Sequence, residues 1–232
     1  MNAIIETLTA VGIFAVGLVA RLGIVFLVMA ALLDPVLMLA GGMKAVKKAQ
    51  LWFQGYRAAG GLRFRNGLLY APGHTWVKEG GKSLRVGLDD LAQTLVPWSV
   101  SVSLPEPGKA VKAGEVVARI SCGQREIGVA APVSGRVSMV NTAVAREPTL
   151  AKSDGYGAGW LFEIEPESSS WRALPGGEAA RSWLEAEGNR LTRFYEHQLG
   201  MSAADGGEII GSPEDHLTDA QWRALTQSFL RT

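Results

Sequence analysis

The chain is poor in the residues that most catalytic and metal sites require. It has a single cysteine, Cys122. One cysteine cannot form an internal disulfide, so nothing in the sequence requires an oxidising compartment. The histidines His74, His197 and His216 are far apart, without the Cys/His spacing of a metal site. There is no P-loop, no Gly-x-Gly-x-x-Gly after a strand and no haem-attachment motif. We therefore predict neither an enzyme nor a metal site, and we identify no small-molecule substrate.

Net charge is also low, and it is unevenly distributed. The 232 residues contain 23 Lys+Arg and 22 Asp+Glu, a balance of +1 that argues against a nucleic-acid binder. No acidic residue occurs between Asp34 and Glu79, whereas thirteen acidic residues face seven basic ones after Leu150. A hydrophobic content of 47% excludes a wholly disordered chain.

A long apolar run near the N-terminus predicts a membrane span. Residues 8–33 are apolar or Gly/Ala except Thr9 and Arg21, and apolar residues resume at 35–43. About 20 apolar residues cross a bilayer core. Only Glu6 is charged before the run, which does not fit the basic start of a signal peptide. We predict one uncleaved transmembrane helix within 1–43.

The basic segment 44–67 that follows sets the expected orientation. By the positive-inside rule, it places the N-terminus outside and the domain in the cytoplasm, at a bacterial inner membrane. An amphipathic stretch at headgroup level and a solvated basic linker both fit this composition. In either case the cluster should favour an anionic membrane surface, and the residues expected to contact it are Lys44, Lys47, Lys48, Trp52 and Arg57.

Two charges in or beside the apolar run need a partner. Asp34-Pro35 favours a helix boundary, which leaves Arg21 deep in the hydrocarbon. In the alternative register, Asp34 is the buried charge. We expect Arg21 and Asp34 to contact another membrane subunit or a lipid, although snorkelling of Arg21 is an equal alternative.

From about residue 68 the pattern changes to short apolar runs separated by Gly/Pro turns. This spacing is typical of a small all-β sandwich or barrel. The predicted strands are 84–87, 100–104, 116–120, 135–140 and 161–164. A short helix is expected at 89–95 and an amphipathic helix at 178–199. The core-facing candidates of the longer helix are Ala180, Trp183, Leu184, Leu191, Phe194 and Tyr195.

The C-terminal tail, after a Gly-rich gap, begins a last helix at a capping-box pattern of Thr218 and Gln221. Its apolar residues Trp222, Leu225 and Phe229 are expected to dock on a partner, because a short amphipathic helix gains stability on packing. The alternative is that this helix packs on its own domain.

Several ordered motifs resemble the glycine-cleavage-system H protein. They are Gly73-His74-Thr75-Trp76-Val77, 86–93, 104–108, Pro132-Val133-Ser134-Gly135, Val140-Asn141 and 153–161. The resemblance covers roughly residues 69–166. It implies a barrel-sandwich hybrid domain, the fold of lipoyl and biotinyl carriers, with the cofactor-bearing lysine on an exposed hairpin tip.

That lysine is missing. In the H protein it lies eight positions before the Pro of Pro-Val-Ser-Gly, which corresponds here to Gln124. No lysine occurs between Lys112 and Lys152. Lipoylation needs a primary amine, so we expect no lipoate. Cys122, near the same turn, is expected to be a small buried residue rather than a redox group.

The predicted organisation has five segments: a transmembrane helix (1–43), a basic juxtamembrane segment (44–67), an H-protein-like barrel-sandwich domain (68–170), an amphipathic helix packing on it (171–199), and a linker with a docking helix (200–232). The first functional hypothesis is a non-catalytic, membrane-anchored accessory subunit of an energy-converting complex, photosynthetic or respiratory, in which a lipid or pigment could be bound. The alternative is a carrier or adaptor module with a lipoyl-domain-like role in acyl or one-carbon transfer, or in export machinery.

Overall fold

The computed structural model describes residues 56–96, 101–199 and 217–230, which all belong to one compact unit, 55–232. The predicted transmembrane helix and residues 44–55 of the basic segment lie outside the described residues. Within the described ranges, no helix is long and apolar enough to cross a bilayer.

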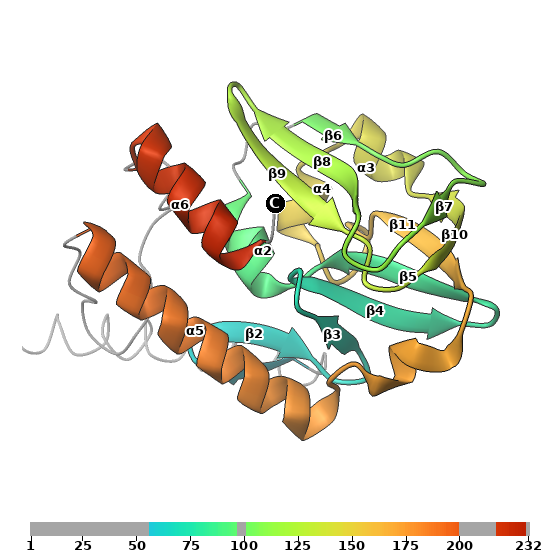
Figure 1. Ribbon diagram of the computed structural model, residues 1–232, viewed down its shortest axis with the longest axis horizontal. Coiled ribbons are helices and arrows are strands. Elements are labelled where there is room, and N and C mark those ends of the chain that lie inside the picture. The colour runs from blue at the N-terminus through green and yellow to red at the C-terminus, as the bar shows by residue number, and fades with distance from the viewer. Residues whose placement is uncertain (1–55, 97–100, 200–216, 231–232) are drawn as a thin grey trace, which may run out of the picture. The chain divides into compact units, whose positions relative to one another are not determined.

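The larger sheet has the strand order β3-β4-β5-β11-β10-β7, with every neighbouring pair antiparallel. Its strands are β3 (Leu69–Ala71), β4 (Thr75–Gly80), β5 (Ser83–Leu88), β11 (Phe162–Pro166), β10 (Gly135–Val140) and β7 (Ala110–Val111). Figure 1 shows β11 returning from late in the chain to lie between β5 and β10.

The smaller sheet contains β6 (Ser101–Ser103), β8 (Val116–Cys122) and β9 (Arg125–Ala130), in the order β6-β8-β9. Both sheets contribute to one hydrophobic core, which includes Trp76 and Val86 from the larger sheet and Ile120 and Ile127 from the smaller. The mainly-β domain predicted from the sequence is confirmed.

A third, two-stranded sheet corrects the predicted domain boundary. Strands β1 (Tyr56–Ala59) and β2 (Leu62–Arg65) form a hairpin inside the compact unit, although 44–67 was predicted to be a juxtamembrane segment. The burial of β2 alternates, with Leu62 and Phe64 in the core. Its cations have partners within the domain. Arg63 pairs with the buried Asp90 at 2.8 Å, and Arg65 donates to the carbonyl of Tyr156 at 3.0 Å.

Helices close the fold on two sides (Figure 1). They are α2 (Asp90–Leu95), α3 (Thr142–Arg146), α4 (Leu150–Ser153), the 3-10 helix η1 (Ser169–Ala173), α5 (Gly177–Leu199) and α6 (Asp219–Phe229). In α5, Ala180, Leu184, Leu191 and Tyr195 are buried as predicted, while Trp183 and Phe194 are partly buried against the core. The capping box of Thr218 and Gln221 that starts α6 is also confirmed.

The structure explains why several motif residues are needed. The Trp76 indole donates to the carbonyl of Gly155 at 2.9 Å, and the Tyr156 hydroxyl donates to the carbonyl of Arg63 at 2.9 Å. At Gly135 a Cβ atom would lie 2.2 Å from the carbonyl oxygen of Glu165 in the neighbouring strand. Only glycine permits that approach between β10 and β11. These motif residues therefore hold loops and strands together.

Candidate functional site

The candidate site is the tip of the β8–β9 hairpin. The two strands pair from Val116↔Ala130 to Cys122↔Arg125, which leaves Gly123 and Gln124 as a two-residue turn. Gly123 has a φ of 59°, as the common tight hairpin turns require. Both turn residues are exposed. In Figure 1 this hairpin extends away from the rest of the domain, so its tip is accessible to another molecule.

The chemistry at the tip is polar and contains no amine. On the strands beside it, Arg119 forms a cross-strand ion pair with Glu126, and both side chains are largely exposed. Cys122 is half-buried. The Gln124 side chain ends in a neutral carboxamide, which donates and accepts hydrogen bonds but does not form the amide that holds lipoate. The site can therefore bind through hydrogen bonds and charge, without an attached arm.

Next to the turn, Arg125 fastens the hairpin to the C-terminal segment. Its Nη2 donates to the carbonyl of Leu217 at 2.6 Å and lies 3.3 Å from Oδ1 of Asp219. Its guanidinium carbon is 5.3 Å from the ring centroid of Trp222. No local sequence motif distinguishes Arg125 from other surface arginines, so this role could not be predicted from the sequence.

The three predicted docking residues lie in this chain's own core. Trp222, Leu225 and Phe229 are 3%, 0% and 2% exposed. Helix α6 contacts both α5 and β9, and the Phe229 ring meets Phe194 of α5 edge-on with centroids 5.9 Å apart. In this conformation the three side chains are not available to a partner, as expected if the helix packs on its own domain.

A buried charged cluster lies where α5 covers the sheet. His74 has 1% exposure, and its Nδ1 lies 2.8 Å from Oδ2 of Asp89. Its Nε2 lies 3.8 Å from Oε2 of Glu187 on α5, and its ring stacks on Trp183 with centroids 5.2 Å apart. Burial alone would lower the pKa of His74, but the charge and hydrogen bond of Asp89, followed by Glu187, raise it to about 9. The imidazole is thus held as a cation that joins the β4 region to α5.

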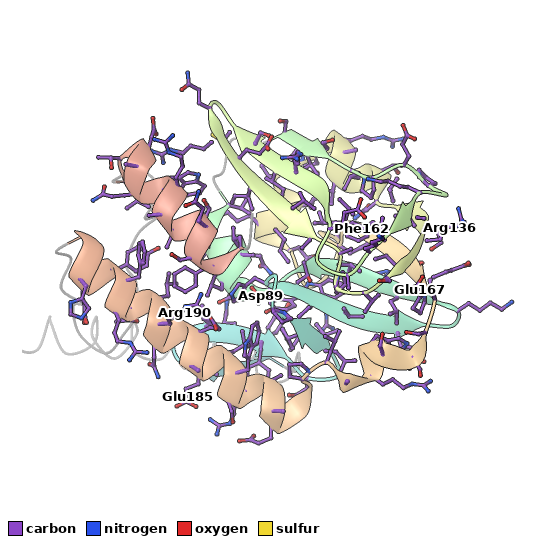
Figure 2. All side chains as sticks on the ribbon, viewed as in Figure 1. Asp89, Arg136, Phe162, Glu167, Glu185 and Arg190 are labelled. Carbon is purple, nitrogen blue, oxygen red and sulfur yellow. The ribbon has the colours of Figure 1, made fainter. Side chains whose placement is uncertain are left out.

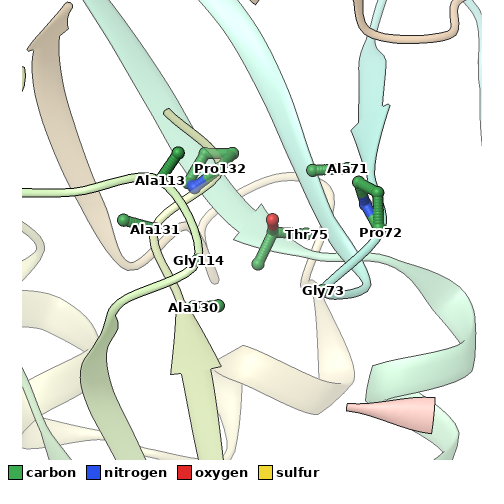
Figure 3. Close-up of a pocket in the computed structure, with 9 residues that line it drawn as sticks. All are labelled: Ala71, Pro72, Gly73, Thr75, Ala113, Gly114, Ala130, Ala131 and Pro132. Carbon is green, nitrogen blue, oxygen red and sulfur yellow. The ribbon is translucent and has the colours of Figure 1, made fainter. Parts of the chain in front are cut away.

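A cavity of about 270 Å³ opens between the turns at 71–75, 113–114 and 130–132 (Figure 3). Its lining residues are small, and Thr75 is fully buried there. No hydrogen-bond partner for the Thr75 Oγ1 occurs among the described residues. The cavity could take a small group that supplies one hydrogen bond. No group of three potential metal-ligating side chains was found in the described part of the chain.

Of the predicted membrane residues, only Arg57 falls within the described ranges. Arg21, Asp34, Lys44, Lys47, Lys48 and Trp52 lie outside the described residues. Arg57 lies in β1, where its backbone pairs with Phe64. Its backbone thus belongs to a strand of the domain, and its expected contact with anionic lipid stays a prediction.

Comparison with known proteins identifies the domain. A model of the glycine cleavage H-protein family matches residues 68–186. The chain belongs to the glycine cleavage H-protein family. The glycine cleavage system H protein of Mycobacterium bovis (strain BCG / Pasteur 1173P2) is 40% identical over 126 residues, which cover 54% of this chain and 92% of that protein.

Other H proteins match over a similar region. The mitochondrial glycine cleavage system H protein of Pisum sativum is 39% identical over 103 residues, 44% of this chain and 62% of that protein. A crystal structure of the H protein from Mycobacterium marinum aligns with a TM-score of 0.45 and 28% identity, covering 55% of this chain and 99% of that one.

The H-protein family match does not extend over the whole described structure. The hairpin β1–β2 precedes residue 68, and the end of α5 and all of α6 follow residue 186. Glu187 and Arg190 therefore lie outside the matched region, and so do the C-terminal residues that Arg125 contacts. The resemblance could not have revealed them.

Proposed function

We propose that this chain is a non-catalytic adaptor of the H-protein family whose hairpin tip carries no lipoate. One observation carries the proposal: Gln124 occupies the exposed turn where the resemblance to H proteins predicts the lipoyl lysine. The described lysines, Lys78, Lys82, Lys109, Lys112 and Lys152, all lie outside the β8–β9 hairpin. The fold is kept while the attachment point for the arm is absent.

The family supports an adaptor role for a physical reason. Enzymes that act on a carrier must recognise its surface as well as its arm, so the carrier domain is itself a protein-binding module. A domain that keeps this surface without an arm can hold a partner in place but cannot transfer a group. Family membership favours this role over a subunit of a photosynthetic or respiratory complex. The membrane location stays a prediction from the N-terminal sequence.

Restoring the amine tests the proposal. The full-length chain is incubated with lipoate, ATP and a lipoate–protein ligase, and its intact mass is measured. We expect the wild-type protein to stay unmodified and Gln124→Lys to gain one lipoyl group, because the tight turn already exposes this position. Gln124→Arg, which adds the charge without an amine that can be acylated, is the matched control and should stay unmodified.

Two outcomes would contradict the proposal. Lipoylation of the wild-type chain would mean that another lysine serves as the attachment point, which is the carrier alternative. A Gln124→Lys chain that is folded but unmodified would contradict the assignment of Gln124 to the lipoyl-lysine position, which is the observation that carries the proposal.

A further inference from the structure

Helix α6 occupies a defined surface beside the hairpin tip, which we call the helix seat. The seat consists of β9, with Arg125 at its start, and the part of α5 that carries Arg190 and Phe194. In Figure 1, α6 lies between α5 and β9, and it contacts both elements. The covered face of α6 is apolar, with Trp222, Leu225 and Phe229 buried.

An arginine from each side of the seat holds one end of α6. Arg125 binds the carbonyl of Leu217 and the Trp222 ring at the start of the helix. Arg190, labelled in Figure 2, donates to the carbonyl of Ser228 at 2.5 Å and lies 4.3 Å from the centroid of the Phe229 ring. Each arginine thus donates a hydrogen bond to a main-chain carbonyl oxygen and lies over the face of an aromatic ring. These contacts select for an amphipathic helix with aromatic residues near both ends rather than for one sequence.

The present occupant fits the seat imperfectly. Helix α6 has 11 residues, a length at which an isolated helix is marginal. The Trp222 Nε1 is buried, and no hydrogen-bond partner for it was found in the described ranges. Burying an unpaired donor costs free energy. The ion pair from Arg125 to Asp219 is weak as well, because the Asp219 side chain is 71% exposed. A helix that fits this surface better could therefore displace α6 from it.

We propose that the helix seat is a docking surface for an amphipathic helix of a partner protein, and that α6 covers it until the partner binds. This inference rests on the proposed adaptor function and specifies the class of partner. The partner helix would carry apolar side chains at the spacing of Trp222, Leu225 and Phe229. It would also carry an acidic residue in its first turn, at the position that Asp219 occupies in α6. Binding of the partner helix would displace α6 from the helix seat and leave the β8–β9 turn exposed.

A labelled peptide of residues 217–232 serves as the probe, and its binding to full-length protein is followed by fluorescence anisotropy. Ala224 lies on the exposed face of α6, so Ala224→Pro breaks the helix without altering the seat. We expect Ala224→Pro to bind the peptide at least tenfold more tightly than wild type. Ala224→Lys keeps the helix and should match wild type. Adding Arg125→Ala to Ala224→Pro should reverse the gain.

A folded Ala224→Pro chain that binds no better than wild type would overturn the proposal. If this variant loses cooperative unfolding, Asp219→Ala replaces it, with about a threefold gain expected from loss of one exposed ion pair. A wild-type dimer that the peptide dissociates would make the occupant a second copy of this chain, and would also overturn the assignment. Lipoylation does not enter this assay, so its failure is distinguishable from failure of the proposed adaptor function.

Discussion

Gly188→Ala is expected to lower the free energy of unfolding by about 2–3 kcal/mol, as overpacking of a tight contact does. The usual effect in a helix is the reverse, since alanine is favoured over glycine by about 1 kcal/mol. Here a Cβ at Gly188 of α5 would lie 2.0 Å from the carbonyl oxygen of Gly60. The obstructing atoms are backbone atoms of the β1–β2 turn, so the hairpin itself would have to move away from the helix.

Denaturant unfolding of the full-length chain measures this effect. The matched control is Asn189→Ala, one residue along α5 and exposed to solvent, which should be neutral or stabilising by a few tenths of a kcal/mol. A Gly188→Ala protein as stable as Asn189→Ala would show that the first hairpin does not pack on α5 as described. The domain boundary near residue 55 would then lose its main structural support.

The buried His74 is expected to make the domain less stable as pH rises from about 6.5 to 9. Its pKa is raised from the ordinary histidine value of 6.5 to about 9 in the folded chain, so the folded state holds the proton more tightly. The stabilisation is fully present below pH 6.5 and is lost as pH rises through about 9. The loss should be on the order of 3 kcal/mol.

His74→Asn is the control for this prediction. The backbone φ of His74 is 55°, a left-handed conformation that asparagine tolerates better than most residues. The variant should be less stable at pH 6 and should lack the fall in unfolding free energy between pH 6.5 and 9. The same slope in both proteins, measured by urea unfolding across this range, would contradict a charged His74 between Asp89 and Glu187.

The regular parts of the domain could be predicted from local pattern. Strands that follow Gly or Pro turn signals, such as β8 and β10, and the amphipathic helix α5 were found where predicted. Strand β9 was missed because Glu126 and Gly128 interrupt its apolar residues. The hairpin β1–β2 was missed because its arginines were attributed to a membrane surface, although Leu62-Arg63-Phe64-Arg65 alternates as a half-buried strand does.

The candidate site also has one part that could be predicted from local sequence and other parts that could not. The position at which the resemblance places the lipoyl lysine could be predicted from the sequence, because counting back from Pro132 leads to Gln124. The roles of Arg125 and Arg190 could not. Both contact residues 38 or more positions away, and only the folded chain brings those segments together. The same is true of the ion pair between His74 and Glu187.

The decisive measurement for the proposed function is the mass of the intact protein, isolated from the cells that produce it. We expect the mass of the polypeptide with no lipoyl group, because Gln124 stands at the hairpin tip and no lysine lies within that hairpin. A lipoyl or acyl adduct that peptide fragmentation assigns to a lysine of the H-protein domain would contradict it and make this chain a carrier.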